Sequence, residues 1–199
     1  VRLGLTGRHQ VANAVAAAAA ALALGLELDQ IAAGLTAAAP RSRWRMELHD
    51  RSDGVTVIND SYNANPESMR AALSTLVELG RRGRRGRRTW AVLGDMLELG
   101  DTAAEEHEAI GRFAAQLGVE HLVAIGEHAN RITEAAVDAG LLPTSAVVVT
   151  DKPAALAVLT AGLGPRDVVL VKASRGLALD TVADDILSAV AAPPLEDPG

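Results

Sequence analysis

The fold is decided by the stretch from Val57 to Arg70, which reads Val-Ile-Asn-Asp-Ser-Tyr-Asn-Ala-Asn-Pro-Glu-Ser-Met-Arg. It begins as a strand, because two β-branched residues come shortly after a Ser-Asp-Gly turn signal. It ends as a helix, because Pro66 suits a first helical position and Asn65 can cap that helix. Polar residues fill positions 59–63 between the two elements. The stretch therefore predicts a strand, a polar loop and a helix start.

The position of this polar loop indicates a ligand site. Loops between the carboxyl end of a strand and a helix N-terminus are where α/β sheets bind their ligands. The Asp60 carboxylate can accept a hydrogen bond from a ribose hydroxyl, and amides such as that of Asn63 can meet a base or a carboxylate. The alternative is an Asx-rich turn that only caps the helix. Spacing alone leaves both interpretations open.

Strand and helix patterns alternate along most of the chain. The spacing predicts strands at residues 45–50, 55–59, 89–93, 121–125, 146–149 and 167–171. It predicts helices at residues 9–24, 28–38, 67–79, 102–117, 129–139, 152–161 and 179–191. The first two strands form a hairpin across a Gly-containing turn. The remaining alternation predicts an α/β fold with a Rossmann-like, mostly parallel, doubly wound sheet.

Residues 1–40 do not fit this pattern. They consist of a short strand-like segment and two helices, which are too little to bury a core of their own. We therefore expect them to be the end of a larger domain that is mostly missing, with a second domain over residues 41–199. A basic segment at residues 41–45 links the two.

Composition excludes several classes of protein. The net charge of −6 argues against a general nucleic-acid binder, and the absence of cysteine excludes disulfides and thiolate chemistry. The Arg- and Gly-rich segment at residues 81–88 hints at nucleic acid, but it lacks aromatic residues for stacking and is better interpreted as a solvated loop. The apolar run at residues 11–24 is too short to span a bilayer. We expect neither a nucleic-acid partner nor membrane insertion.

Two further loops lie at predicted strand ends. The loop at residues 94–100 carries acidic side chains that can receive an ammonium group or merely cap helices. After the last strand come Lys172, Ser174 and Arg175, which combine two cations and a hydroxyl and so suit a carboxylate. The alternative for this segment is a plain polar turn. His107, a lone histidine in the following helix, is expected to serve packing or the surface rather than a ligand.

Four motifs resemble the Mur ligase family. Asp-Ser-Tyr-Asn-Ala-Asn-Pro at residues 60–66 resembles the signature that opens the C-terminal domain in the branch that adds D-alanyl-D-alanine. Residues 94–100 and 171–176 resemble two other loops of that branch, with Ala173 replacing a glycine. Residues 7–14 are similar to a segment near the end of the family's central ATPase domain, although Gln10 replaces an asparagine.

The resemblance implies roles for individual residues. It implies that ATP is bound by Asn13, Arg45, Asp60 and Asn63. It implies that D-alanyl-D-alanine is bound by Lys172, Ser174 and Arg175. In the alternative interpretation, Asn13 only hydrogen-bonds within the first helical turn and Arg45 belongs to a solvated linker. Arg43 is the second candidate for the ATP phosphates, because a two-residue misalignment is easy in this segment.

The resemblance also implies a reaction. The full-length enzyme would be a monomeric cytoplasmic ligase that uses ATP and Mg²⁺ to join D-alanyl-D-alanine to UDP-N-acetylmuramoyl-tripeptide through an acyl phosphate. These 199 residues contain no Gly-x-x-Gly-Lys-Thr phosphate loop and no metal-ligand spacing. We therefore expect the metal ligands and phosphate loop upstream, no catalytic residue in this chain, and no activity from this chain alone.

A rival interpretation is a stand-alone Rossmann-like module that binds a nucleotide or a partner. It explains the missing phosphate loop without any missing domain. The sequence upstream of Val1 distinguishes the two: a continuous reading frame with a phosphate loop supports the ligase, and a start codon near Val1 supports the module.

Overall fold

The structure, a computed structural model, describes residues 1–4, 7, 9–38, 43–81 and 86–189. The helices are α1 (His9–Ala23), α2 (Leu28–Ala37), α3 (Pro66–Gly80), α4 (Ala103–Leu117), α5 (Ala129–Asp138), α6 (Lys152–Gly162) and α7 (Asp180–Ser188). The strands are β1 (Glu47–Asp50), β2 (Thr56–Asn59), β3 (Thr89–Gly94), β4 (His121–Ile125), β5 (Ala146–Val149) and β6 (Val168–Lys172). Short 3-10 helices lie at Gly100–Thr102, Pro143–Ser145 and Arg175–Leu177.

Every predicted helix, and every strand predicted after residue 40, is present with ends shifted by at most three residues, whereas the strand-like start of the chain forms no strand over described residues 1–4. Within the described residues, the strands form one sheet in the order β1-β2-β6-β3-β4-β5. β1 is antiparallel to β2, and all other neighbouring strands are parallel. The predicted α/β fold, with an N-terminal hairpin on a mostly parallel sheet, is confirmed.

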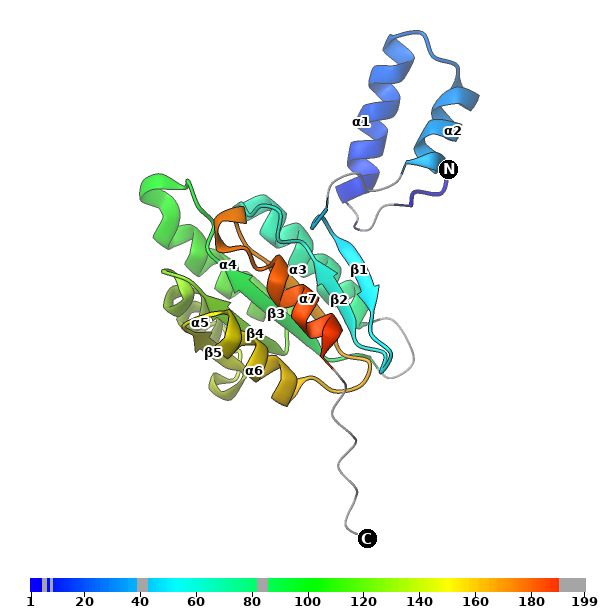
Figure 1. Ribbon diagram of the computed structural model, residues 1–199. Helices are drawn as coiled ribbons and strands as arrows, with labels where there is room; N and C mark the ends of the chain where they lie inside the picture. Colours follow the sequence, from blue (N-terminus) through cyan, green and yellow to red (C-terminus); the bar gives the residue numbers. More distant parts are fainter. Residues whose placement is uncertain (5–6, 8, 39–42, 82–85, 190–199) are drawn as a thin grey trace.

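Helices cover both faces of this sheet, as a doubly wound fold requires (Figure 1). α3, α4 and α5 pack on one face and α6 and α7 on the other. Because side chains alternate along a strand, neighbouring residues of β6 enter different layers. Leu170 faces the α3 layer, whereas Val169 and Val171 face the α7 layer.

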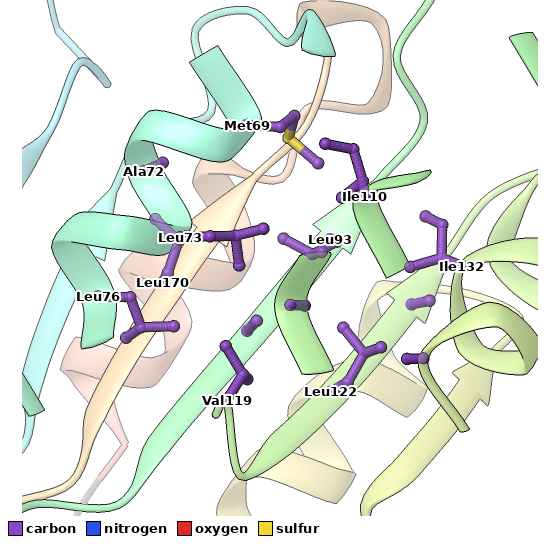
Figure 2. Packing of buried hydrophobic residues seen from close by; sticks show 14 of the residues in the cluster. Met69, Ala72, Leu73, Leu76, Leu93, Ile110, Val119, Leu122, Ile132 and Leu170 are labelled. Carbon is purple, nitrogen blue, oxygen red and sulfur yellow. The ribbon is translucent and has the colours of Figure 1, made fainter. Parts of the chain in front are cut away.

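The buried residues of the core on the α3 face are aliphatic. Figure 2 shows Met69, Leu73 and Leu76 of α3 directed toward the strands, with Leu170 and Leu93 among the side chains they meet. Burying each such side chain fully stabilises the fold by about 1.5–3 kcal/mol. α4 packs against α5 at Gly111, where the absence of a side chain leaves room for the backbone of Ile132.

The first two helices lie apart from the sheet. α1 and α2 contact each other and extend away from the rest of the molecule beyond β1 (Figure 1). The predicted division between residues 1–40 and 41–199 stays a prediction, and its boundary falls outside the described residues. Residues 82–85 of the basic segment and residues 190–199 at the end of the chain also lie outside them. Over the described part of the chain, no helix combines the length and hydrophobicity needed to cross a bilayer.

Candidate functional site

The candidate site lies at the carboxyl ends of β2 and β6, where α3 begins. β2 pairs in parallel with β6, and Asn59 is in register with Val171. The Asn65 side chain caps α3 by accepting from the Ser68 N–H at 2.8 Å, and the Ser68 hydroxyl accepts from the Asn65 N–H at 3.1 Å. The predicted cap is confirmed. The loop at residues 60–64 therefore passes over the strand ends to a fixed helix N-terminus, whose partial positive charge favours anions.

A cavity of about 370 Å³ opens at this edge. Its lining residues come from α1, from the linker before β1, from the loop after β2, from the first turns of α3 and from the end of β6: Gln10, Asn13, Arg45, Met46, Asp60, Tyr62, Asn63, Asn65, Glu67, Ser68, Ala71, Ala72 and Lys172. All four residues predicted to bind ATP lie around this cavity. Of the three predicted to bind the dipeptide, only Lys172 does.

Lys172 and Asp60 form a buried ion pair beside the cavity. The Lys172 Nζ lies 2.6 Å from Oδ2 of Asp60, and Lys172 and Asp60 are only 1% and 9% exposed. The ammonium also donates to the Asn63 carbonyl at 2.9 Å. Burial lowers the pKa of Lys172 below its usual value, the negative charge of Asp60 opposes this shift, and the positive charge of Arg45 adds to it.

The loop that carries Asp60 also holds the linker before β1. Oδ1 of Asp60 accepts from the Met46 N–H at 3.0 Å, and the Tyr62 N–H donates to the Trp44 carbonyl at 3.0 Å. Trp44 and Met46 both have left-handed backbone conformations, with φ of 59° and 50°. Non-glycine residues adopt this conformation rarely, and it persists only where surrounding contacts enforce it.

Arg45 lies between these two anchored residues. Its side chain is exposed, and its guanidinium carbon lies 4.2 Å from the centre of the Tyr62 ring. The second candidate, Arg43, lies over the Trp44 ring at 5.0 Å and is not among the residues that line the cavity. The arrangement presents a guanidinium to the cavity, where it can bind a polyphosphate bidentately.

The two amides predicted for ATP make local contacts. The Asn13 Nδ2 donates to the side chain of Gln10 at 3.2 Å, within the first turns of α1. The Asn63 Oδ1 accepts from the Ala64 N–H at 2.9 Å. Both contacts are compatible with the structural alternative for these residues as well as with a ligand role, so their assignment to ATP stays a prediction.

Ser174 and Arg175 lie outside the cavity lining. The Ser174 hydroxyl accepts from the Leu97 N–H at 2.9 Å and donates to the Ala64 carbonyl at 3.4 Å, while the residue is 3% exposed. Arg175 is exposed, pairs with Asp180 at 2.9 Å and lies 4.0 Å from the centre of the Trp44 ring. Ser174 therefore joins two site loops, and Arg175 presents a cation at the surface.

The acidic loop after β3 is tied to the start of α5. The Asp95 carboxylate accepts from the N–H groups of Glu127 and His128 at 2.8 and 3.0 Å. These bonds hold the loop after β3 against the two residues that precede α5. His107 is buried and accepts from the Met96 N–H at 2.8 Å, as expected for a packing residue.

Sequence reasoning missed the grouping of Lys172 with Asp60. It ended the last strand at residue 171 and placed Lys172 in the loop with Arg175, whereas Lys172 is the last residue of β6. The available signal was the alternation along β6, which puts Lys172 on the same face as Leu170 and thus beside the start of α3. It also missed the Tyr62 ring beneath Arg45, for which the sequence holds no signal.

Comparison with known proteins gives the family. The sequence model of "Mur ligase, glutamate ligase domain" matches residues 44–175. The chain is 49% identical to the UDP-N-acetylmuramoyl-tripeptide–D-alanyl-D-alanine ligase of Mycobacterium tuberculosis (strain H37Rv) over 201 residues, covering 94% of this chain and 39% of the relative. It is 35% identical to the ligase of the same name from Escherichia coli (strain K12), covering 92% and 38%.

A solved structure agrees. The chain superposes on MurF from Acinetobacter baumannii with a TM-score of 0.79 and 33% identity, covering 95% of this chain and 39% of that one. The chain thus spans about two fifths of the length of the curated relatives that it matches. A family match over most of the chain, together with the α/β fold on which it falls, identifies the chain as a member of the Mur ligase family.

Proposed function

We propose that this chain is the C-terminal part of an ATP-dependent ligase that joins D-alanyl-D-alanine to UDP-N-acetylmuramoyl-tripeptide in peptidoglycan precursor synthesis. The observation that carries the proposal is the cavity at the ends of β2 and β6, around which Asn13, Arg45, Asp60 and Asn63 gather. The names of the relatives supply the substrates. We further propose that the full-length enzyme is monomeric and cytoplasmic.

The groups around the cavity fit a nucleotide. Arg45 offers a guanidinium to phosphate oxygens, and the N-terminus of α3 adds a favourable potential for anions. Asp60 and Asn63 offer an acceptor and an amide to ribose and base. When bound, ATP supplies the phosphoryl group that activates the tripeptide carboxylate as an acyl phosphate. The dipeptide amine then displaces phosphate and forms the amide bond.

The contribution of this chain is binding and orientation. Its described residues hold no cluster of three or more His, Asp or Glu side chains suited to a metal ion. We propose that the Mg²⁺ ligands lie upstream of this chain. We assign the adenosine side of the site to the cavity. Closing this chain over the reacting groups would exclude water, which protects an acyl phosphate from hydrolysis.

For the dipeptide, we propose the loop after β6. Arg175 is an exposed cation at a strand end and suits the free carboxylate of D-alanyl-D-alanine. Ser174 supports this loop through its bond to Leu97. Lys172 precedes Ser174 and Arg175 in the sequence, but its side chain contacts Asp60 and Asn63 of the proposed nucleotide site.

The test is ligation by the full-length enzyme that contains this chain. With the tripeptide precursor, D-alanyl-D-alanine, ATP and magnesium, we expect phosphate release coupled to formation of the pentapeptide product. The isolated 199-residue chain should release no phosphate, because it lacks a phosphate loop. Turnover by the isolated chain at roughly 1 to 1000 per second would contradict the second expectation. A full-length enzyme without ligation would contradict the first.

A further inference from the structure

Among the described residues, the buried ammonium of Lys172 donates to the loop after β2. A lysine ammonium carries three N–H donors. Three protein acceptors surround this one: Oδ2 of Asp60 at 2.6 Å, the Asn63 carbonyl at 2.9 Å and the Asp60 carbonyl at 3.5 Å. At 1% exposure, Lys172 is also shielded from solvent. The hydrogen bonds of the Lys172 ammonium therefore hold the loop after β2.

Asp60 connects Lys172 to the linker before β1. Its Oδ2 is held by Lys172, and its Oδ1 receives the Met46 N–H. Tyr62, two residues after Asp60 in the same loop, donates its N–H to the Trp44 carbonyl. The loop thus fixes the backbone on both sides of Arg45.

The side chain of Arg45 is held from the same loop. Its guanidinium lies over the Tyr62 ring at 4.2 Å, a cation–π contact that orients a planar cation. Trp44 and Met46, on either side of Arg45, have the left-handed conformations already described, which require outside contacts to persist. The backbone hydrogen bonds to Met46 and Trp44 come from Asp60 and Tyr62, and Lys172 holds the Asp60 side chain.

We propose that Lys172 is a positioning residue that acts through Asp60 to place Arg45 at the cavity for the phosphates of ATP. The inference rests on the proposed function, and it moves Lys172 from the dipeptide site, where the sequence predicts it, to the nucleotide site. Lys172 itself need touch neither substrate.

The test is a double-mutant cycle in the full-length enzyme, with Lys172→Met, Arg45→Ala and their combination. We expect Lys172→Met to raise the KM for ATP roughly tenfold or more, the loss expected for a charged hydrogen bond, with little change in the KM for D-alanyl-D-alanine. In the Arg45→Ala background the same change should add little, because the group it positions is already gone. Lys152→Met is the control, since Lys152, at the start of α6, is the only other lysine in these 199 residues.

A second variant separates positioning from folding. Lys172→Met alone leaves a buried, unpaired carboxylate, which can unfold the loop. Lys172→Met combined with Asp60→Asn removes both charges, and a circular dichroism melt should then return toward that of the parent. The KM for ATP should stay raised in this combination, because the charge-assisted bond to the Met46 amide is weakened and the loop has lost its ammonium. A parental KM for ATP in this folded variant would overturn the proposal.

Two further outcomes would also overturn it. A rise in the KM for the dipeptide with an unchanged KM for ATP would place Lys172 on the dipeptide. Independent, multiplicative effects of Lys172→Met and Arg45→Ala would show that Lys172 does not act through Arg45. A parent enzyme that binds ATP but does not ligate would contradict the proposed function and not the role of Lys172. The double-mutant cycle would then be measured as affinities for ATP by calorimetric titration.

Discussion

The imidazole of His107 accepts a hydrogen bond from the Met96 N–H through Nε2 at 2.8 Å and contacts the Ala103 carbonyl through Nδ1 at 2.6 Å. A carbonyl can only accept, so Nδ1 carries the proton and the ring is neutral. Burial lowers the pKa of His107 below its usual value. One neutral ring therefore joins the loop after β3 to the first turn of α4.

This ring makes stability depend on pH. The folded state keeps His107 neutral, whereas the unfolded chain takes up a proton near pH 6.5. The unfolded state therefore binds more protons below pH 6.5, and the free energy of unfolding falls as the pH drops from there to the lowered pKa, by up to about 1.4 kcal/mol per pH unit. We expect His107→Gln, whose side-chain oxygen can replace the Nε2 acceptor, to reduce this slope.

Denaturant unfolding at pH 7.5 and 5.5 measures the difference. His121, whose pKa burial also lowers, is present in both proteins and cancels in the comparison. Equal slopes for the parent and His107→Gln would show that His107 does not couple folding to protons.

Asp60→Ala in the full-length enzyme should raise the KM for ATP more than the KM for D-alanyl-D-alanine. Losing a charged hydrogen-bond acceptor costs about 1.5–3 kcal/mol. Asp60→Asn is the graded control, because it keeps an oxygen for the Met46 N–H while removing the charge that faces Lys172. Steady-state kinetics with each substrate varied in turn measures both constants. Equal effects on the two substrates would point to a purely structural role for this loop.

Arg175→Ala in the full-length enzyme should weaken the dipeptide far more than ATP. Losing a charge-assisted hydrogen bond to the dipeptide carboxylate should cost about 1.5–3 kcal/mol. Arg131→Ala is a closely matched control, because the two arginines are 50% and 49% exposed and each pairs with a carboxylate at 2.9 Å. Kinetics with the dipeptide varied decides the matter. A parental KM for the dipeptide with a raised KM for ATP would assign this loop to the nucleotide.

Gly111→Ala should destabilise the protein by about 1–3 kcal/mol, the usual cost of overpacking. A Cβ at this position would lie 2.0 Å from the Ile132 carbonyl oxygen, so α4 and α5 would have to separate. Gly34→Ala is the matched control within α2, where no atom lies within 4 Å of the added Cβ.

The control should raise stability by about 0.5–1 kcal/mol, because alanine favours a helix interior more than glycine does. Guanidinium unfolding followed by circular dichroism compares the two variants with the parent. Similar effects of both substitutions would contradict the close contact between α4 and α5.

The sequence predicted the elements well because their signals are local. Pro66 and Asn65 mark the start of α3, and the alternation of strands with helices gives the doubly wound class. The position of β6 between β2 and β3 is a consequence of long-range pairing, which local patterns do not encode. That position is what brings Lys172 beside Asp60, across 112 residues of sequence.

The candidate site was predictable only in part. Asp60 and Asn63 lie at the cavity because they follow the carboxyl end of β2, whereas Asn13 and Arg45 reach it from α1 and from the linker before β1. The conformations of Trp44 and Met46 were not predictable, since neither is a residue type that favours a positive φ. The burial of Ser174 was missed for a similar reason: its partner Leu97 comes from a loop far away in the sequence.

The Lys172–Asp60 pair also restricts how this sequence can diverge. A substitution at either position alone leaves an unpaired charge in the interior. A joint replacement removes both charges and can leave the free energy of unfolding nearly unchanged. Mutations at positions 60 and 172 should therefore be accepted in pairs during evolution. Among related ligases, the residues at these two positions should therefore covary, although 112 residues separate them in the sequence.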